Sequence, residues 1–300
     1  MSIVSLFNRL PGGIAQGLIW GIMALGVYIT FRVLNESDLT VDGSFATGGA
    51  VAVMSIYYGV SPVIALLLAF ISGILCGICT GLITTKLKIP AILSGILVQL
   101  ALYVVNLHIM NMSSNVAISL DANDLFISIR NQNRTIFICI AIAIIIIALM
   151  YWYFGTEQGC AIRATGNSNH MAIAQGINID NMKVLGFALG NGLVALAGAI
   201  LSEYQGYSDI NMGRGAIVIG LAAIIIGEAI LKVIFKKGCS FYTRLSFVIA
   251  GGILYYIVMI LILWLGIDSN DLKLFTALIV MVFLAIPNLK RGKKKYVKTK

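Results

Sequence analysis

Long apolar runs separated by short polar interruptions form the main pattern of this chain. About 20 apolar residues in a helix cross the hydrocarbon of a bilayer. Nine runs approach that length, at residues 13–34, 43–60, 62–85, 90–110, 134–154, 183–203, 216–235, 241–267 and 270–287. We expect helices because lipid satisfies no open backbone group, and the alternation of a membrane β-strand is missing. The pattern predicts an all-α, polytopic membrane helix bundle of about nine spans (roughly eight to ten), some short or broken, in one domain over residues 1–287.

Composition supports a lipid environment. Of the 300 residues, 59% are hydrophobic and 11% are charged, whereas about 25% are charged in an average soluble domain. The net charge of +9 would suggest nucleic acid as the partner of a soluble protein, but membrane proteins collect Lys and Arg in cytoplasmic loops. Seven of the 21 basic residues lie in residues 288–300. We interpret this segment as a basic cytoplasmic tail near anionic lipid, and expect no nucleic acid.

The distribution of basic residues also predicts an orientation. With the tail inside the cell and nine alternating spans, 16 of the 21 Lys and Arg residues fall inside and five fall outside. Cytoplasmic loops of membrane proteins carry such an excess of positive charge. We therefore expect a cytoplasmic C-terminus and an N-terminus outside the cell.

Two segments, 39–54 and 213–231, are short and rich in glycine and other small residues. The first opens with a carboxylate, Asp42. Broken segments in the two halves of a chain indicate a transport path, because unwound backbone is tolerated in a membrane only where it lines a cavity or is buried in protein. The alternative is a pair of tightly packed ordinary helices.

Motifs for catalysis and metal binding are missing from the sequence. It contains no H-E-x-x-H, no Cys/His cluster, no G-x-S-x-G and no P-loop of the form G-x-x-x-x-G-K-[ST]. We therefore predict a transporter and not an enzyme, with no catalytic residue, no metal and no cofactor on this chain.

The most informative polar region is the long loop over residues 155–182. It begins with a predicted polar turn at Thr165–Ser168, where Asn167 or Ser168 caps a short helix over Asn169–Gln175. Gly176 is placed to end that helix. The helix is small-faced, nearly uncharged and too polar to insert into lipid, which favours a docking element. A plain amphipathic connector is the alternative.

The residues of this loop resemble a known segment. The run Arg163-Ala-Thr-Gly-Asn-x-x-x-Met-Ala-x-x-x-Gly-Ile177 is similar to the coupling segment of bacterial ABC-importer permeases, in the family of the branched-chain amino acid and ribose permeases. The similarity extends through residues 190–201, 39–45 and 213–231. His170 departs from the pattern, since we expect Pro or a small residue there, and this leaves the cap of the helix open.

The resemblance implies a division of labour. The permease would be a homodimer in a bacterial cell membrane, with two cytoplasmic ABC ATPases, which bind ATP and Mg, and an extracellular solute-binding lipoprotein. The substrate would be a small solute, best matched by an amino acid and in particular an aromatic one. The ATPases would be contacted by Arg163, Ala164, Thr165, Gly166, Asn167, Asn169, Ala172 and Gly176.

Polar side chains inside predicted spans are rare and therefore informative. One set follows helical spacing on a single face, at Gln99, Tyr103 and Asn106. The other candidates for the translocation path are Asp42, Ser44, Phe45, Asn191 and Glu203. Hydrogen bonds between helices are the alternative role for these side chains, and for Asn191 the two interpretations are equally supported.

A second function remains open from the sequence, namely an ion- or proton-coupled secondary transporter of a small polar solute. Its coupling sites would be the carboxylates of Asp42, Glu203 and Glu228. Lys232 lies four residues after Glu228, so a local salt bridge is the simpler role for that carboxylate. A carrier that needs no partner also has no use for the 155–182 loop.

Overall fold

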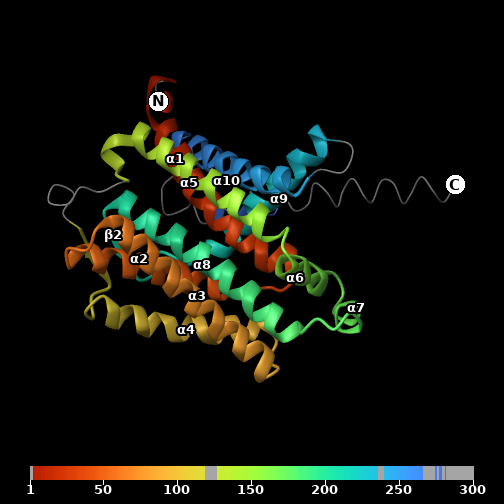
Figure 1. Cartoon of the computed structure of the whole chain (residues 1–300). Coiled ribbons are helices and arrows are strands. Elements are labelled where there is room, and N and C mark those ends of the chain that lie inside the picture. The colour runs from red at the N-terminus through yellow and green to blue at the C-terminus, as the bar shows by residue number, and fades with distance from the viewer. Residues whose placement is uncertain are drawn as a thin grey trace.

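A computed structural model describes residues 3–118, 127–235 and 240–265, together with 274, 275, 277, 278 and 281. Within these residues the chain is a bundle of long helices (Figure 1). Two short helices, α6 (Glu157–Asn167) and α7 (Asn169–Ala174), lie at one end of the bundle, here called the α6–α7 end. A two-stranded antiparallel sheet of β1 (Asn115–Ala117) and β2 (Tyr207–Asp209) lies at the other, here called the sheet end.

The long helices follow the predicted apolar runs closely. They are α1 (Ile3–Tyr28), α2 (Thr40–Tyr57), α3 (Pro62–Lys86), α4 (Ala91–Ile109), α5 (Gln132–Tyr153), α8 (Ile179–Gln205), α9 (Ala216–Ile234) and α10 (Phe241–Trp264). A π-helical turn, η1 (Ile29–Val33), continues α1, and a 3₁₀ turn, η2 (Ile129–Asn131), precedes α5. The prediction of an all-α polytopic bundle is confirmed, and the small sheet is an addition that the apolar pattern did not indicate.

Seven helices in the described part are long and apolar enough to cross a membrane: α1 with η1, α3, α4, α5, α8, α9 and α10. The predicted span 43–60 corresponds to α2, which is helical and almost wholly buried but stands outside these seven, because Thr, Ser, Gly and Asp42 lower its hydropathy. The predicted ninth span, 270–287, falls almost entirely outside the described residues, and the tail 288–300 falls wholly outside them.

Helix α8 is the centre of one side of the bundle. It packs against α1, α2 and α3, and glycines permit very close contact. A Cβ added at Gly77 of α3 would overlap the Phe187 carbonyl of α8, and one at Gly48 of α2 would overlap the Ala195 carbonyl. Small residues let membrane helices approach in this way.

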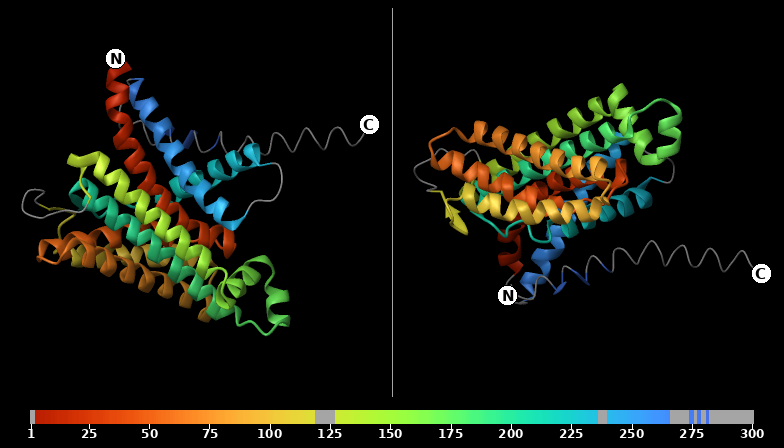
Figure 2. Two further views of the ribbon diagram at one scale, coloured as in Figure 1. Left: turned by 45° about the horizontal axis from the view of Figure 1, so that its top comes forward. Right: turned by 90° about the horizontal axis from the view of Figure 1, so that it is seen from below.

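Helices α1, α9 and α10 form the other side, as the left view of Figure 2 shows. Gly17 of α1 lies against Gly252 and Ile253 of α10, where an added Cβ would be 2.7 Å from the Ile253 Cα. Helix α1 also contacts α8 and α5, so it joins the two sides. The bundle is therefore built around two helices, α1 and α8, with few polar side chains between them.

The 155–182 region corrects one expectation and confirms another. The predicted turn at Thr165–Ser168 is wrong, because α6 stays helical to Asn167 and only Ser168 is extended. The predicted short helix is confirmed as α7, and its cap is Ser168, whose hydroxyl accepts a hydrogen bond from the Met171 backbone N–H at 3.4 Å. Gly176 follows with φ of 76°, a left-handed conformation that suits glycine at a helix end.

Candidate functional site

The two irregular segments of the sequence meet where α2 and α9 begin. The Asp42 carboxylate of α2 accepts hydrogen bonds from the backbone N–H groups of Gly215, at 2.9 Å, and Ile217, at 3.0 Å. Gly213 packs on the Asp42 carbonyl, where an added Cβ would overlap the oxygen. Since the start of a helix presents unpaired N–H groups and a partial positive charge, Asp42 acts as a cap for a helix far away in the sequence.

A buried network joins α2 to α8 through Asn191. The Asn191 Oδ1 accepts a hydrogen bond from the Ser44 hydroxyl at 2.7 Å, and its Nδ2 donates to the Asp38 carboxylate at 2.6 Å and to the Phe187 carbonyl at 3.0 Å. The side chains of Asp38, Ser44 and Asn191 are at most 2% exposed. These polar groups are therefore hydrogen-bonded within the chain, and all three side chains are buried from water.

The same network continues to α3. Asp38 also accepts the backbone N–H of Thr40 at 2.9 Å, and the hydroxyls of Thr40 and Thr80 are 2.7 Å apart. Asp38 was not among the predicted site residues, although it lies in the polar interruption before Asp42. The sequence shows the Asp38 carboxylate. Its bond to Asn191 of α8 depends on how residues 34–39 run along the bundle, which the sequence does not show.

The remaining in-membrane candidates do not gather at one place. On α4, Gln99 is half-buried, Tyr103 is 41% exposed and Asn106 is buried. The predicted common face is therefore partly inside the bundle and partly exposed. Among the described elements, α4 makes its main contacts with α2 and α3, and its other side is exposed. Glu203 of α8 is fully buried near the sheet end, and its carboxylate oxygens have no hydrogen-bond partner among the described residues.

A pocket of about 450 Å³ opens at the sheet end. Its lining combines aromatic rings with amide and carboxylate side chains and comes from α1, α8, α10 and the sheet region: Gln16, Trp20, Asn115, Leu201, Gln205, Tyr207, Asp209, Asn211, Met212 and Tyr256. Trp20 is only 7% exposed. Its ring stacks on Phe45 at 5.0 Å between centroids and on Tyr256 at 6.1 Å.

Phe45, a predicted path residue, therefore stacks on a ring that lines this pocket. Gln16, Trp20 and Tyr256 were missed by the sequence analysis. Single-helix spacing carries no signal for them, because α1 and α10 are distant in sequence and meet only in the fold.

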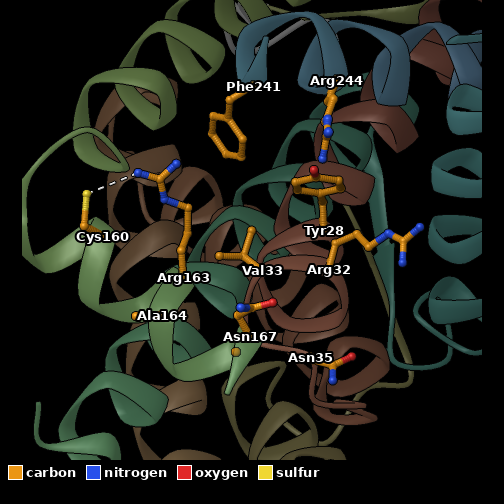
Figure 3. Close-up of a pocket in the computed structure, with 11 residues that line it drawn as sticks. Tyr28, Arg32, Val33, Asn35, Cys160, Arg163, Ala164, Asn167, Phe241 and Arg244 are labelled. Atoms are coloured by element: carbon orange, nitrogen blue, oxygen red, sulfur yellow. Dashed lines mark hydrogen bonds between the residues drawn. The ribbon is translucent and has the colours of Figure 1, made fainter. Parts of the chain in front are cut away.

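A second and larger pocket, of about 820 Å³, lies at the α6–α7 end (Figure 3). Helix α6 contributes Arg163, Ala164, Gly166 and Asn167 to its lining. Gly166 also packs against the end of η1, where an added Cβ would overlap the Val33 carbonyl oxygen. The predicted coupling residues therefore pack on the segment that leads to Asp38.

The eight predicted coupling residues differ in their surroundings. Thr165 and Ala172 are buried within the chain, at 2% and 1% exposure, and serve the packing of α6 and α7. Arg163, Asn167, Asn169 and Gly176 are exposed. Met171 and Ile173 of α7 are exposed large apolar side chains at the outer surface of this end.

Glu228 of α9 has a stronger partner than the one that spacing predicts. Its carboxylate accepts hydrogen bonds from the Nε and Nη2 groups of Arg32 in η1, and the Lys232 Nζ is 3.7 Å away. A second ion pair at this end joins Lys183 of α8 to Glu36. The predicted local salt bridge is present, but the contact that joins separate elements is the one to Arg32.

Comparison with known proteins identifies the kind of molecule. The family described as "Branched-chain amino acid transport system / permease component" matches residues 10–285. The chain belongs to this family. It is 38% identical to the tyrosine transport system permease protein of Clostridioides difficile (strain R20291) over 282 residues, which cover 93% of this chain and 92% of that protein.

More distant relatives of this permease are consistent with the family. An uncharacterized protein of Rickettsia prowazekii is 32% identical over 287 residues, which cover 95% of this chain and 99% of the relative. The ribose import permease protein of Escherichia coli K12 is 26% identical over 294 residues, which cover 97% and 87%. No solved structure has significant similarity to the chain.

As a permease component of an ABC-type transport system, the chain is a transporter subunit without a catalytic domain. Such a permease implies an ATPase partner and a binding-protein partner. The part of the permease that the structure describes contains no cluster of His, Cys, Asp and Glu that could hold a metal ion.

Proposed function

We propose that this permease forms the membrane path of an ATP-driven importer for a small amino acid, with aromatic amino acids among its substrates. The similarity to a tyrosine transport system permease over nearly the whole chain carries this proposal. The pocket at the sheet end supports it, because the rings of Trp20 and Tyr256 suit an aromatic side chain. The amides of Gln16 and Gln205 suit the charged groups of a zwitterion.

The path begins in this pocket and is closed beneath it. Trp20 stacks on both Phe45 and Tyr256. We place the barrier at this ring, because Phe45 follows Ser44 of the buried network on α2. Opening requires Trp20 or α2 to move, because Phe45 belongs to α2. A barrier of stacked rings is suited to this task, since it packs densely and carries no charge that would retain the solute.

The energy of ATP hydrolysis is proposed to reach the permease at the α6–α7 end. ATPases are proposed to bind α6 and α7, where Met171 and Ile173 form an exposed apolar surface beside the exposed coupling residues. A displacement of α6 passes through Gly166 to Val33 and Leu34, which α6 contacts directly. Four residues later Asp38 holds the start of α2 against α8, and α2 carries Phe45.

In this arrangement the α6–α7 end faces the cytoplasm and the sheet end faces outside. The assembly is a homodimer in a bacterial cell membrane, with two ATPases that bind ATP and Mg and a solute-binding lipoprotein at the sheet end. The N-terminus is outside and the tail 288–300 is cytoplasmic. The basic residues support this orientation, because Arg32, Arg163, Lys183 and Lys232 all lie toward the α6–α7 end.

Uptake into vesicles tests the proposal. The complete importer, reconstituted with its ATPases and binding protein, is expected to accumulate labelled tyrosine when ATP is supplied to the ATPases. It should not accumulate labelled ribose. A proton uncoupler should leave this uptake unchanged. Accumulation by the permease alone, or uptake that an uncoupler stops, would overturn it.

The secondary-transporter alternative has little support from the carboxylates it would use. Asp42 caps α9, and Glu228 is paired with Arg32. Glu203 is the remaining candidate, and Glu203→Gln decides its role. An ATP-driven importer should tolerate this neutral replacement of a buried, unpartnered carboxylate, whereas a proton-coupled carrier would lose transport.

A further inference from the structure

The pocket at the α6–α7 end is strongly basic. Arg32 of η1, Arg163 of α6 and Arg244 of α10 line it from three elements that are far apart in sequence (Figure 3). Arg32 is neutralised by Glu228, which Lys232 also approaches. Arg163 and Arg244 have no carboxylate partner among the described residues, so the pocket carries two uncompensated positive charges.

The surroundings of these two arginines position them without neutralising them. The Arg163 guanidinium donates to the Cys160 sulfur at 3.2 Å and lies 6.0 Å from the centre of the Phe241 ring. Arg244 points toward the hydroxyl of Tyr28 (Figure 3). Most N–H donors of both guanidinium groups have no partner among the described residues, and a guanidinium binds phosphate oxygens in pairs.

Two further pockets adjoin this basic pocket through shared lining residues, and the more distant one is an apolar groove. A neighbouring pocket of about 480 Å³ shares Arg163 and Phe241 with it and is also lined by Trp152 and Phe154. Those two residues in turn line a third pocket, of about 430 Å³. Its walls come from α3, α5 and α8 and are otherwise Ile, Leu, Met, Phe and Tyr side chains, among them Ile145 and Leu193.

We propose that these adjoining pockets together bind a phospholipid with an anionic headgroup. Its phosphate lies between Arg163 and Arg244, and one acyl chain lies along the groove between α5 and α8. The combination decides the ligand class, because a water-soluble anion has no use for the groove and a lipid without net charge leaves the two arginines uncompensated. Basic pockets between membrane helices bind anionic headgroups for the same reason.

Such a lipid contacts three elements of the α6–α7 end at once. It touches α6 through Arg163, α10 through Arg244 and α5 through Trp152. Since α6 belongs to the coupling segment, the lipid fixes the position of that segment against the bundle. The site itself rests on charge and shape, and its existence does not depend on which solute the permease carries.

Lipid binding by the purified full-length chain tests the proposal. Phosphatidylglycerol and phosphatidylcholine with identical long acyl chains are compared in a neutral detergent by native mass spectrometry. We expect phosphatidylglycerol to bind about tenfold more tightly, and Arg244→Gln to remove most of that preference. Arg214→Gln, a matched change of an exposed arginine at the sheet end, should leave it intact. Equal binding of both lipids, or equal loss in both variants, would overturn the proposal.

Further measurements separate the lipid from a free anion and from a folding defect. Inorganic phosphate and a short-chain phosphatidylglycerol should compete poorly with the long-chain lipid, and competition at equal concentration would mean that the groove is not used. Arg244→Lys keeps the charge and should keep most of the preference. If Arg244→Gln does not fold, Ile145→Trp serves instead, because it fills the groove from an exposed position and should weaken long-chain binding without lowering thermal stability.

Discussion

At the scale of single residues, rarity in the membrane singled out side chains that the fold joins in hydrogen bonds, but not the partners of those side chains. Asn191 and Ser44 are bonded to each other, as polar groups inside a bundle should be. Their third partner, Asp38, could not be predicted, because it depends on how residues 34–39 run along α8. Trp20 could not be predicted for a related reason. An aromatic residue in an apolar span carries no distinguishing signal, and the stacking of Trp20 on Phe45 and Tyr256 exists only in the fold.

Asn191→Leu is expected to destabilise the permease. The change leaves the Asp38 carboxylate and the Ser44 hydroxyl buried without their partner, which costs about 3 kcal/mol or more. Thermal unfolding of the purified protein measures the loss. The double variant Asp38→Leu and Asn191→Leu should recover part of it, because it removes the buried carboxylate as well. If Asn191→Leu keeps full thermal stability and loses transport alone, Asn191 lines the path instead.

Trp20→Leu is expected to weaken the barrier beneath the sheet-end pocket. Leucine keeps an apolar side chain but loses the stacking on Phe45 and Tyr256, which is worth about 1 kcal/mol for each ring pair. Passive leak of labelled tyrosine out of loaded vesicles should rise about three- to tenfold, and accumulation driven by ATP should fall. Trp20→Phe keeps a ring in place and is the control. A leak that is unchanged in Trp20→Leu would exclude Trp20 as a barrier.

At the scale of elements, the apolar pattern predicted the long helices well, because each must satisfy its backbone within itself and present about 20 apolar residues to lipid. It failed at α6, where Thr165, Gly166 and Asn167 resemble a turn. Contacts outside the helix decide that region: Thr165 is buried, and Gly166 fits against Val33 and Leu34. The meeting of α2 with α9 was equally hidden, since Asp42 caps a helix that begins 174 residues later.

Gly166→Ala is expected to uncouple the permease from its ATPases. The added methyl group overlaps the Val33 carbonyl and forces α6 away from the segment that leads to Asp38. Tyrosine uptake per ATP hydrolysed should fall several-fold while the permease still assembles with its partners. Gly12→Ala is the matched control, because it is also a helical glycine and its added Cβ has no neighbour closer than 3.5 Å. Equal coupling ratios in the two variants would rule out the contact of α6 with η1 as the route.

At the scale of the whole molecule, the fold places basic residues at opposite ends of the bundle, and the side of the membrane that each end faces stays a prediction. Arg163 and Lys183 lie at one end of the bundle, and Arg214 follows β2 toward the other. The sequence did not predict which residues form the pockets and the buried network of the bundle. The aromatic pocket, the buried network and the basic pocket each draw residues from helices that are remote in sequence, and only the packing around α1 and α8 brings them together.

The proposed orientation predicts which side of the membrane exposes each end. Cys160 of α6 is exposed and lies at the α6–α7 end, so a membrane-impermeant maleimide should label it only after cells are permeabilised. A cysteine introduced as Arg214→Cys, at the sheet end, should react in intact cells. Both proteins also carry Cys239→Ser, which removes a cysteine that lies outside the described part of the chain. Cys160→Ser is the negative control. Labelling of Cys160 in intact cells would reverse the orientation, and the ATPases could not then reach α6 and α7.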